Sequence, residues 1–460
     1  MWPFPHNARA QVTFTTLMAF DGTNGAVPEA ALIEGSVGSF YGTTMEGGAY
    51  TNFGTVFEIT TNGVFRNLIS FNSTNGAFPQ AGLTQDAEGN LWGTTYLGGT
   101  FGDGTLFKIA TNGSFTSFPF SVADGDQPNA VLVQGTNGSY YGTTVFGGTN
   151  GYGSVFQFTQ SGVVTTVASF NGTNGSYPYD SGLLPGVEGN DFFGVAAFGG
   201  DGFDPAVTYS GWGTIFKVTT GGLLTNLAFF HGTNGAFPVG VLVRGMDGNL
   251  YGTTGAGGIG FDGTTYSGYG TVFKITGDST LTTLFWFNST NNGAYPFAGL
   301  ALGADGNLYG TTQQGGTNYP PNPNSGTVFQ VTPEGKLTTL VSFGANNGFP
   351  IGGLVQGSDG DFYGTTTSGS TNGYGGIFRL HVPGAASPRL QCTPKPGGGI
   401  SFNWIPLRGR TYELQYSTNF AGGNWTNLGP PMTSTNSPAT ASDTIAPGAG
   451  QRFYRLLLVP

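Results

Sequence analysis

The chain has 460 residues, of which 38% are hydrophobic, 14% aromatic and only 8% charged, and its formal net charge is −10. A disordered chain is rich in charge and poor in aromatic residues, so this composition predicts a packed core. The acidic balance argues against nucleic acid and anionic membranes as partners, because both require a basic surface. The 84 glycines recur at fixed places in a longer repeat, which indicates many short strands joined by tight turns.

Residues 1–11 form a leader before the first recognisable repeat, and they lack the basic start and the apolar run of a secretory signal. No stretch of 18 apolar residues is present, so no membrane span is predicted. A polar surface built from Asn, Thr, Ser and Gly suits an exported protein. We therefore expect an extracellular or cell-surface protein whose export signal is absent from this sequence.

A repeat dominates residues 12–384. Five copies of Tyr-Gly-Thr-Thr and two related strings, Trp-Gly-Thr-Thr and Phe-Gly-Val-Ala, begin at Tyr41, Trp92, Tyr141, Phe193, Tyr251, Tyr309 and Tyr363. These seven copies are 51, 49, 52, 58, 58 and 54 residues apart, close to the length of a four-stranded propeller blade. The spacing predicts an all-β fold, a seven-bladed β-propeller with four strands in each blade.

Each copy contains four segments rich in Thr, Val, Phe and Tyr, and none has the length or period of a helix. In the last copies, the segments 351–356, 362–366, 326–332 and 336–343 are interpreted as the innermost, second, third and outer strands. Acidic residues before the turn glycines are assigned to turn chemistry. One phenylalanine of each third strand is expected to pack between blades: Phe57, Phe107, Phe156, Phe216, Phe273, Phe329 and Phe378.

The two ends of the repeat region are complementary. Residues 12–20 match an outer strand that has no preceding blade, whereas residues 376–381 match a third strand with no outer strand after it. An open array would leave two unpaired strand edges, which favour aggregation. We therefore predict that the N-terminal strand closes the last blade.

Three blocks recur in fixed order: Phe-Asn-Gly-Thr-Asn-Gly-Ser-Tyr-Pro at 170–178, Asp-Gly-Asn-Leu-Tyr-Gly-Thr-Thr at 305–312 and Gly-Thr-Val-Phe-Lys-Ile-Thr at 270–276. These blocks resemble the Gloeo/Verruco tandem-repeat family, from residue 12 to about 382. The resemblance implies a bacterial β-propeller and export. It implies no activity.

The Pro- and Gly-rich segment 385–398 marks the start of a second domain, 385–460. Short segments at 400–404, 411–416, 424–428 and 452–457 predict a small, fibronectin-III-like β-sandwich, and two of its strings resemble C-terminal modules of secreted bacterial proteins. The single cysteine, Cys392, is interpreted as a buried structural thiol. Five arginines gather in this domain and are expected to form a solvated face rather than a partner surface: Arg389, Arg408, Arg410, Arg452 and Arg455.

Motifs for catalysis are missing from the sequence. The three histidines stand apart from one another and form no zinc-ligand pattern, and no nucleophile elbow, phosphate-binding loop or sialidase box is present. We therefore expect no enzyme activity and no cofactor.

Three consecutive loops between the second and third strands are longer than the others. They occupy residues 201–212, 259–269 and 317–325, with 12, 11 and 9 residues against 4 or 5 elsewhere. Their aromatic residues are candidates for sugar stacking: Tyr209, Trp212, Tyr266, Tyr269 and Tyr319. Their carboxylates are candidates for calcium, the one metal considered: Asp201, Asp204 and Asp262. Drift in surface loops is the alternative explanation.

These features predict a monomeric, secreted or cell-surface binding or scaffold propeller, with a glycan or a surface protein as its partner. The alternative is a polysaccharide-active hydrolase or lyase whose site lies on the long-loop face of blades 4–6.

Overall fold

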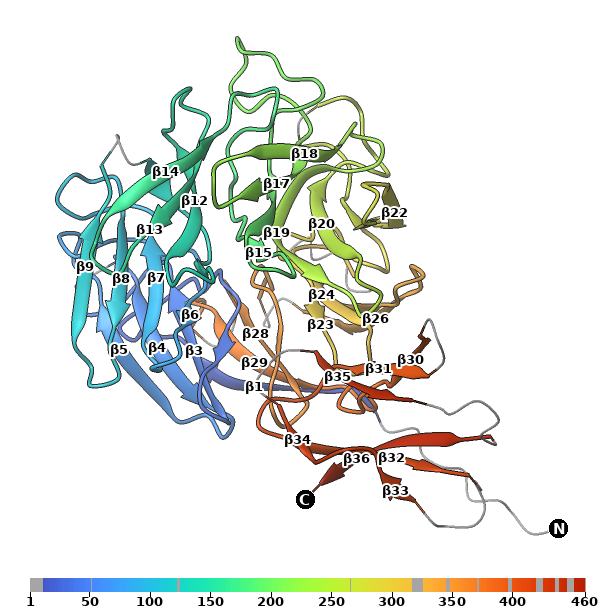
Figure 1. Ribbon diagram of the computed structural model, residues 1–460. Coiled ribbons are helices and arrows are strands. Elements are labelled where there is room, and N and C mark those ends of the chain that lie inside the picture. Colours follow the sequence, from blue (N-terminus) through green and yellow to red (C-terminus); the bar gives the residue numbers. More distant parts are fainter. Residues whose placement is uncertain are drawn as a thin grey trace.

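The structure is a computed structural model, which describes residues 11–50, 52–121, 125–264, 266–316, 326–344, 348–369, 372–395, 399–418, 425–434, 438–444 and 451–459. It is all-β, and these residues contain no helix. Seven antiparallel sheets follow one another over the repeat region in a propeller-like arrangement, and two smaller sheets follow them (Figure 1). In the described part of the chain, no helix is long and apolar enough to cross a membrane.

The strands of the repeat region fall into sheets in chain order. The first and second sheets contain β2 (Ile33–Glu34), β3 (Ser39–Thr44), β4 (Thr55–Thr60) and β5 (Phe65–Ser70), then β6 (Thr84–Gln85), β7 (Leu91–Thr95), β8 (Thr105–Ile109) and β9 (Phe115–Pro119). The third and fourth contain β10 (Asp126–Pro128), β11 (Val133–Gln134), β12 (Tyr140–Phe146), β13 (Ser154–Phe158) and β14 (Val164–Ser169), then β15 (Leu184–Pro185), β16 (Asp191–Ala196), β17 (Thr214–Thr219) and β18 (Leu224–Phe229).

The fifth and sixth sheets contain β19 (Ala236–Arg244), β20 (Leu250–Ala256), β21 (Thr271–Ile275) and β22 (Leu281–Trp286), then β23 (Ala301–Leu302), β24 (Leu308–Thr312), β25 (Thr327–Val331) and β26 (Leu337–Ser342). The seventh contains β27 (Val355–Gln356), β28 (Phe362–Thr366), β29 (Gly376–His381) and, from the other end of the chain, β1 (Thr13–Ala19).

The first strand of the chain thus completes the last sheet of the repeat. β1 pairs antiparallel with β29, from Thr13 opposite His381 to Ala19 opposite Gly376. The ring of Phe14 packs against Phe343 and Phe378, with ring centroids 5.4 and 5.3 Å apart. The pairing predicted for the two ends of the repeat is therefore present.

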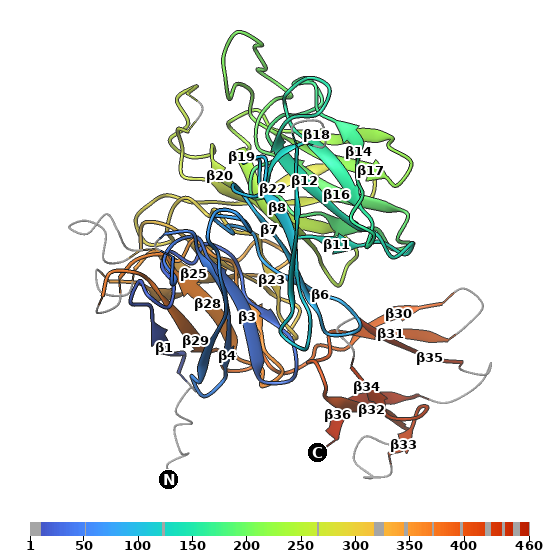
Figure 2. The same ribbon diagram turned by 90° about the vertical axis from the view of Figure 1, so that its left-hand side faces the viewer.

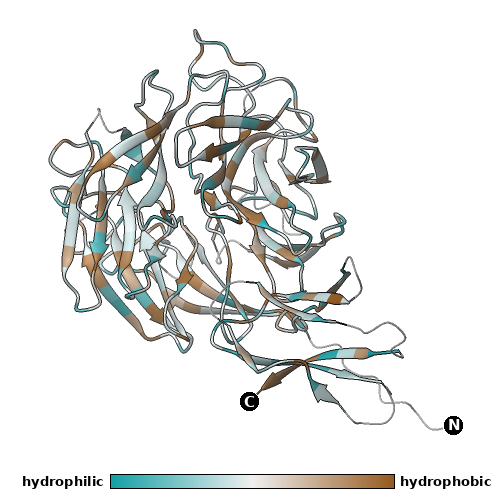
Figure 3. Cartoon of the chain, in the orientation of Figure 1, coloured by the Kyte–Doolittle hydropathy of each residue, from teal (hydrophilic) through white to brown (hydrophobic). Residues whose placement is uncertain are grey.

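Hydrophobic side chains fill the spaces between neighbouring sheets, and Figure 3 shows the hydrophobic colour along the strands. Each sheet shares a buried cluster with the next, and one further cluster joins Tyr363 and Ile377 of the seventh sheet to Phe40 and Phe57 of the first. The repeated phenylalanines of the third strands are at most 2% exposed. The prediction that they pack between sheets is confirmed.

The repeated Gly-Thr-Thr string links six of the seven sheets to the next one, whereas the fourth sheet has Val195 in place of the threonine. Its first threonine donates to a backbone carbonyl that precedes the inner strand of the next sheet, as Thr143 Oγ1 does to Ser181 O at 3.0 Å. Thr365 Oγ1 makes the same bond, 3.2 Å, from the seventh sheet to Ala30 O of the first. Its glycine is needed because a Cβ on Gly42 would lie 2.6 Å from the ring of Phe57.

The inner strands are shorter than predicted. The segment 351–356 was expected to form a strand, but only β27, its last two residues, pairs with β28. The carbonyl of Gly352 instead accepts a hydrogen bond from Thr311 Oγ1 of the sixth sheet, at 3.1 Å. In six sheets, the backbone before the inner strand is therefore held by a threonine of the neighbouring sheet and lies toward the centre of the molecule. The fifth sheet differs, because its inner strand β19 is nine residues long.

Two sheets make up residues 391–459. One contains β30 (Gln391–Pro394), β31 (Ile400–Trp404) and β35 (Ala439–Asp443), and the other β32 (Thr411–Ser417), β33 (Thr426–Asn427), β34 (Met432–Thr433) and β36 (Phe453–Val459). Phe402, Trp404, Tyr412 and Leu414 form a core shared by both sheets. Cys392 is exposed, and its prediction as a buried thiol is wrong, because β30 is an edge strand that lacks a neighbour on one side.

The C-terminal sheets lie on one side of the repeat region (Figures 1 and 2). Arg410 Nε donates to Ser358 O at 3.1 Å, and Arg408 Nη1 donates to Glu34 O. Arg389 N donates to Ala304 O at 3.0 Å. Two arginine side chains and the backbone of a third therefore attach this region to the first, seventh and sixth sheets, while Arg389, Arg410 and Arg455 remain exposed to solvent. Arg452 pairs with Asp443 instead.

We expect limited proteolysis to cut first between residues 383 and 399 and to release the repeat region as one fragment. The double variant Arg408→Ala, Arg410→Ala should be cut several-fold faster, because two contacts that hold the C-terminal sheets are lost. Intact-mass spectrometry of timed digests gives the cut sites. First cuts inside the seven sheets would contradict a separate C-terminal domain.

Candidate functional site

A cavity of about 390 Å³ lies where the inner segments of all seven sheets meet. Most of its lining residues precede the inner strands, namely residues 29–31, 80–82, 129 and 131, 179–180, 297–300, 351 and 353–354, and residues 240–241 of β19 also line it. Phe237 and Tyr266 complete the lining. A volume of this size suits a small ligand, so the centre of the repeat region is the candidate functional site.

A strained bend directs one side chain of most sheets toward this cavity. The residue before a repeated proline has a positive φ, between 47° and 58°, in six sheets: Val27, Phe78, Gln127, Tyr177, Phe237 and Tyr295. Such a conformation costs about 1–3 kcal/mol for a residue other than glycine and concentrates at functional sites. Six of the seven residues that follow the prolines line the cavity: Glu29, Gln80, Asn129, Tyr179, Phe297 and Ile351.

The cavity is polar on one side and apolar on the other. The first four sheets contribute Glu29, Gln80, Asn129 and Asp180, whereas the fifth to seventh contribute the hydrophobic lining residues Phe237, Val241, Phe297, Leu300, Ile351 and Leu354. The lining includes no Lys, Arg or His among the described residues. Hydrogen-bonding groups therefore face a hydrophobic wall across the cavity.

Glu29 is the carboxyl of the first sheet. Burial, together with the nearby carboxyls of Asp180 and Glu46, raises its pKa to about 7. The hydrogen bond from Thr365 to Ala30 O holds the adjacent residue in place. Glu29 is therefore partly protonated near neutral pH.

Asp180 is the carboxyl of the fourth sheet, and it stands at a one-residue insertion between the repeated proline and leucine of that copy. Its φ is 49°, a left-handed conformation. The side chain is accessible from the cavity, but the cavity itself lies deep in the molecule. The desolvation there raises the pKa of Asp180 to about 7.

Two amide side chains beside these carboxyls have unused hydrogen-bonding capacity. Asn129 is 1% exposed, its amide nitrogen lies close enough to Asp180 to lower the pKa of that carboxyl, and its Oδ1 has no donor. Gln80 Oε1 is also buried without a partner. Buried polar groups are nearly always paired, so unpaired ones beside a cavity indicate a ligand or ordered water.

Aromatic residues surround one part of the cavity. Tyr266 contacts Phe198 and Phe237, with ring centroids 6.0 and 5.5 Å apart. Tyr209 contacts Phe198 and Tyr177 at 5.2 and 4.9 Å. Tyr266 and Tyr209 are 56% and 39% exposed, so their rings are open to a ligand. We call these five residues the aromatic cluster.

The structure brings together only some of the residues predicted on the long loops. Tyr266 lines the cavity and Tyr209 belongs to the aromatic cluster. Trp212 packs instead on Phe261 at 5.0 Å, and Tyr269 on Tyr295 at 6.3 Å. Tyr319 lies outside the described residues.

The three aspartates predicted for calcium are engaged separately. Asp201 pairs with His231 Nδ1 at 2.8 Å, Asp204 accepts from Ala206 N at 2.9 Å, and Asp262 accepts from Thr264 at 2.8 Å. Among the described residues, no group of three or more His, Cys, Asp or Glu side chains could hold a metal ion. The described residues thus do not assemble these aspartates into a calcium site.

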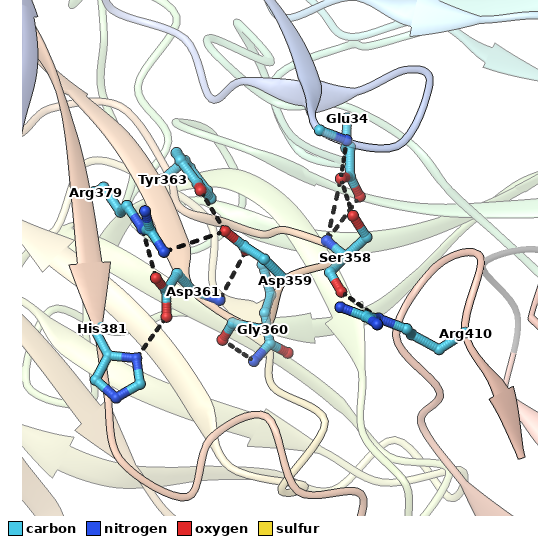
Figure 4. A network of polar contacts seen from close by, with 11 residues as sticks. Glu34, Ser358, Asp359, Gly360, Asp361, Tyr363, Arg379, His381 and Arg410 are labelled. Atoms are coloured by element: carbon cyan, nitrogen blue, oxygen red, sulfur yellow. Dashed lines mark hydrogen bonds and ion pairs between the residues drawn. The ribbon is translucent and has the colours of Figure 1, made fainter. Parts of the chain in front are cut away.

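A second cluster of charged groups lies around the turn between β27 and β28, where Arg410 of the C-terminal region contacts Ser358 (Figure 4). Asp361, 4% exposed, accepts from Arg379 Nε at 2.5 Å and pairs with His381 Nδ1 at 2.7 Å. Tyr363 donates to Asp359 at 2.7 Å, as the tyrosines of other copies do to their turn aspartates. These carboxylates are all paired within the protein, which suits a structural role. Asp247, Asp305 and Asp359 each accept a hydrogen bond from the backbone N–H two residues on, which confirms turn chemistry for these three.

Sequence reasoning missed Glu29, Asp180 and Asn129. The available signal was the residue after each repeated proline, which is Glu, Gln, Asn or Tyr in copies 1–4 and Val, Phe or Ile in copies 5–7. The extra residue of the fourth copy was a second signal. Both are departures from the repeat, but only the structure shows that they face one cavity.

The fold and the cavity define a β-repeat protein with propeller-like sheets around a central pocket that has a polar and an apolar side. The model of the Gloeobacter/Verrucomicrobia repeat matches residues 6–119, 127–317 and 208–391, and the chain belongs to this family. Among curated proteins, none matches the chain.

Several solved structures are similar in fold. A fungal alcohol oxidase of the AA5 family in complex with copper has 12% identity and a TM-score of 0.50, and the match covers 96% of this chain and 91% of that one. An ulvan lyase has 10% identity and a TM-score of 0.48, over 78% of this chain and 94% of that one. A protein from Lactobacillus plantarum has 14% identity and a TM-score of 0.44, over 77% and 88%. At these identities, the first match supports the fold and nothing more.

Proposed function

We propose that the seven sheets form a closed seven-bladed propeller, followed by a fibronectin-III-like module, and that the protein binds a carbohydrate unit in its central cavity. The observation that carries the binding proposal is the cavity itself. It joins unpaired amides and carboxyls to a hydrophobic wall and an open aromatic cluster. Sugars present hydroxyl groups at their edges and apolar C–H faces, so they match both kinds of surface.

Carbohydrate outside cells fits the exported, surface-bound role that the sequence suggests. The C-terminal domain would then position the propeller on a surface, with Arg408 and Arg410 joining the two parts.

A glycan array probed with the full chain tests the proposal. The Tyr266→Ala variant should bind the best glycan about 1 kcal/mol more weakly, or roughly fivefold, because an exposed ring that lines the cavity is lost. Tyr50→Ala is the matched control, since Tyr50 is also 56% exposed and does not line the cavity. Equal loss in both variants, or none in Tyr266→Ala, would place the glycan elsewhere.

A second candidate function is polysaccharide cleavage. Glu29 and Asp180 favour it, because carboxyls whose pKa lies near 7 are suited to general acid–base catalysis. Mass spectrometry of glycans incubated with the protein distinguishes the two functions. If the protein produces shorter glycans and the Asp180→Asn variant does not, the protein is an enzyme. If the glycans remain unchanged, the result supports binding without cleavage.

A further inference from the structure

The acidic groups of the central cavity have no cation to balance them. The described lining contains Glu29 and Asp180 but no Lys, Arg or His. Neither carboxyl makes an ion pair with another described residue. Elsewhere in the chain, Asp361 and Asp443 each pair with an arginine. The two carboxyls of the cavity are therefore not compensated by a cationic side chain of the described residues.

The unpaired groups around the carboxyls are rich in acceptors. The Oδ1 atom of Asn129 and the Oε1 atom of Gln80 are buried and lack donors. Together with two carboxyls, they offer four acceptor groups on one side of the cavity. A protonated primary amine has three N–H donors and no acceptor, so it complements this side.

The opposite side suits the rest of such a ligand. Phe237, Phe297 and Tyr266 line the cavity there. Aromatic rings attract a cation through their faces and also pack against the apolar face of a sugar ring. One ligand with an ammonium group on a sugar ring would use both sides at once.

We propose that the ligand of the central cavity is an amino sugar with a free, protonated amine, held between Glu29 and Asp180. This inference rests on the proposed glycan binding and adds the charge of the ligand to it. The ammonium group balances one carboxylate charge, and its N–H groups can also donate to the amide oxygens that have no donor among the described residues.

The protonation of the cavity supports a dependence on pH. The raised pKa values mean that each carboxyl holds a proton for part of the time near pH 7, and an ammonium group would displace it. Glu46 also raises the pKa of Glu29, and the pair in turn contributes to the raised pKa of its neighbours: Asp180 to that of Tyr96, and both carboxyls to that of Tyr179. None of these groups is a cation that could compete with the amine. Because the two carboxyls lose their protons as the pH rises toward 7, affinity for the amine should rise between pH 5 and 7.

Isothermal titration of the full chain with glucosamine and with glucose tests the inference. We expect glucosamine to bind at least tenfold more tightly at pH 7 and to release protons, seen as a heat that depends on the buffer. Asp180→Asn removes the charge of the side chain and nearly preserves its shape. This variant should weaken the binding of glucosamine at least tenfold and the binding of glucose less than twofold. Glu88→Gln, an exposed acid away from the cavity, is the control and should change neither.

The outcomes separate the two proposals. If glucosamine and glucose bound with equal affinity, and Asp180→Asn weakened both equally, the amine inference would be overturned while the proposed glycan site would stand. A failure of both sugars to bind, together with no glycan that is sensitive to Tyr266→Ala, would overturn both proposals. A glucosamine affinity that falls between pH 5 and 7 would also overturn the amine inference. Circular dichroism of each variant checks that it is folded.

Discussion

Removing residues 1–20 is expected to abolish cooperative folding at ordinary temperatures. The deletion takes away β1, whose backbone pairs with β29 over the whole length of the strand. It also removes Phe14 and Phe20, and Phe20 is fully buried against Phe57 and Phe65 of the first sheet. Truncating a buried phenylalanine to alanine costs about 3–5 kcal/mol, which is a large part of the 5–15 kcal/mol that stabilises a typical protein.

The exposed edge adds a second effect. Without β1, β29 presents unpaired backbone groups to solvent, and such an edge pairs readily with other chains. We therefore expect aggregation as well as a loss of melting temperature, measured by calorimetry and by size-exclusion chromatography.

Two controls isolate the contribution of β1. Deletion of residues 1–10 keeps the strand and should leave the melting temperature unchanged. Phe20→Ala should lower it strongly, whereas Phe101→Ala should not, since Phe101 is 61% exposed. A melting temperature for the deletion of residues 1–20 within about 2 °C of the parent would contradict the closed propeller that we propose.

The protein should become more stable as the pH falls from 8 to 5. The pKa of Glu29 is raised to about 7 in the folded protein, above its ordinary value near 4.5. The folded state therefore holds a proton that the unfolded chain releases between these values, and stability decreases as the pH rises through about 7. Asp180, whose pKa is also about 7, acts in the same direction.

The size of this effect follows from the shift. A shift of one pKa unit corresponds to about 1.4 kcal/mol, so Glu29 contributes at most about 3 kcal/mol, and less because water enters the cavity. Glu29→Gln should therefore flatten the dependence on pH and raise the melting temperature at pH 8. The exposed Glu88→Gln variant should preserve the dependence. If neither Glu29→Gln nor Asp180→Asn altered the dependence of stability on pH, the pKa values of these carboxyls would not be raised by folding.

Below about pH 4, we expect the stability of the protein to decrease as the pH is lowered further. Hydrogen bonds from Trp92 and Asn90 outweigh burial and lower the pKa of Asp86. Its contribution to stability is lost once the carboxylate is protonated. The measurement is therefore confined to pH 5–8, where the cavity acids dominate.

Much of the fold could be predicted from the sequence because the repeat is a local signal copied many times. Turn residues, strand composition and the phenylalanine of each third strand recur at fixed spacing, and the structure places them as expected. The unmatched ends of the repeat predicted the pairing of β1 with β29 for the same reason. A deviation such as the short inner strands was not visible, since the hydrogen bond from Thr311 to Gly352 joins two sheets.

The candidate site was only partly predictable. Tyr209 and Tyr266 drew attention because their loops are long, and length can be seen in the sequence. Glu29 and Asp180 come from the first and fourth copies, far apart in the chain, and only the arrangement of the sheets makes them neighbours across one cavity. The sequence by itself determined the strands, their turns and the pairing of the chain ends, all of which depend on local propensity and repetition. The tertiary structure decided which residues face the centre, because desolvation and charge coupling arise only where distant segments meet.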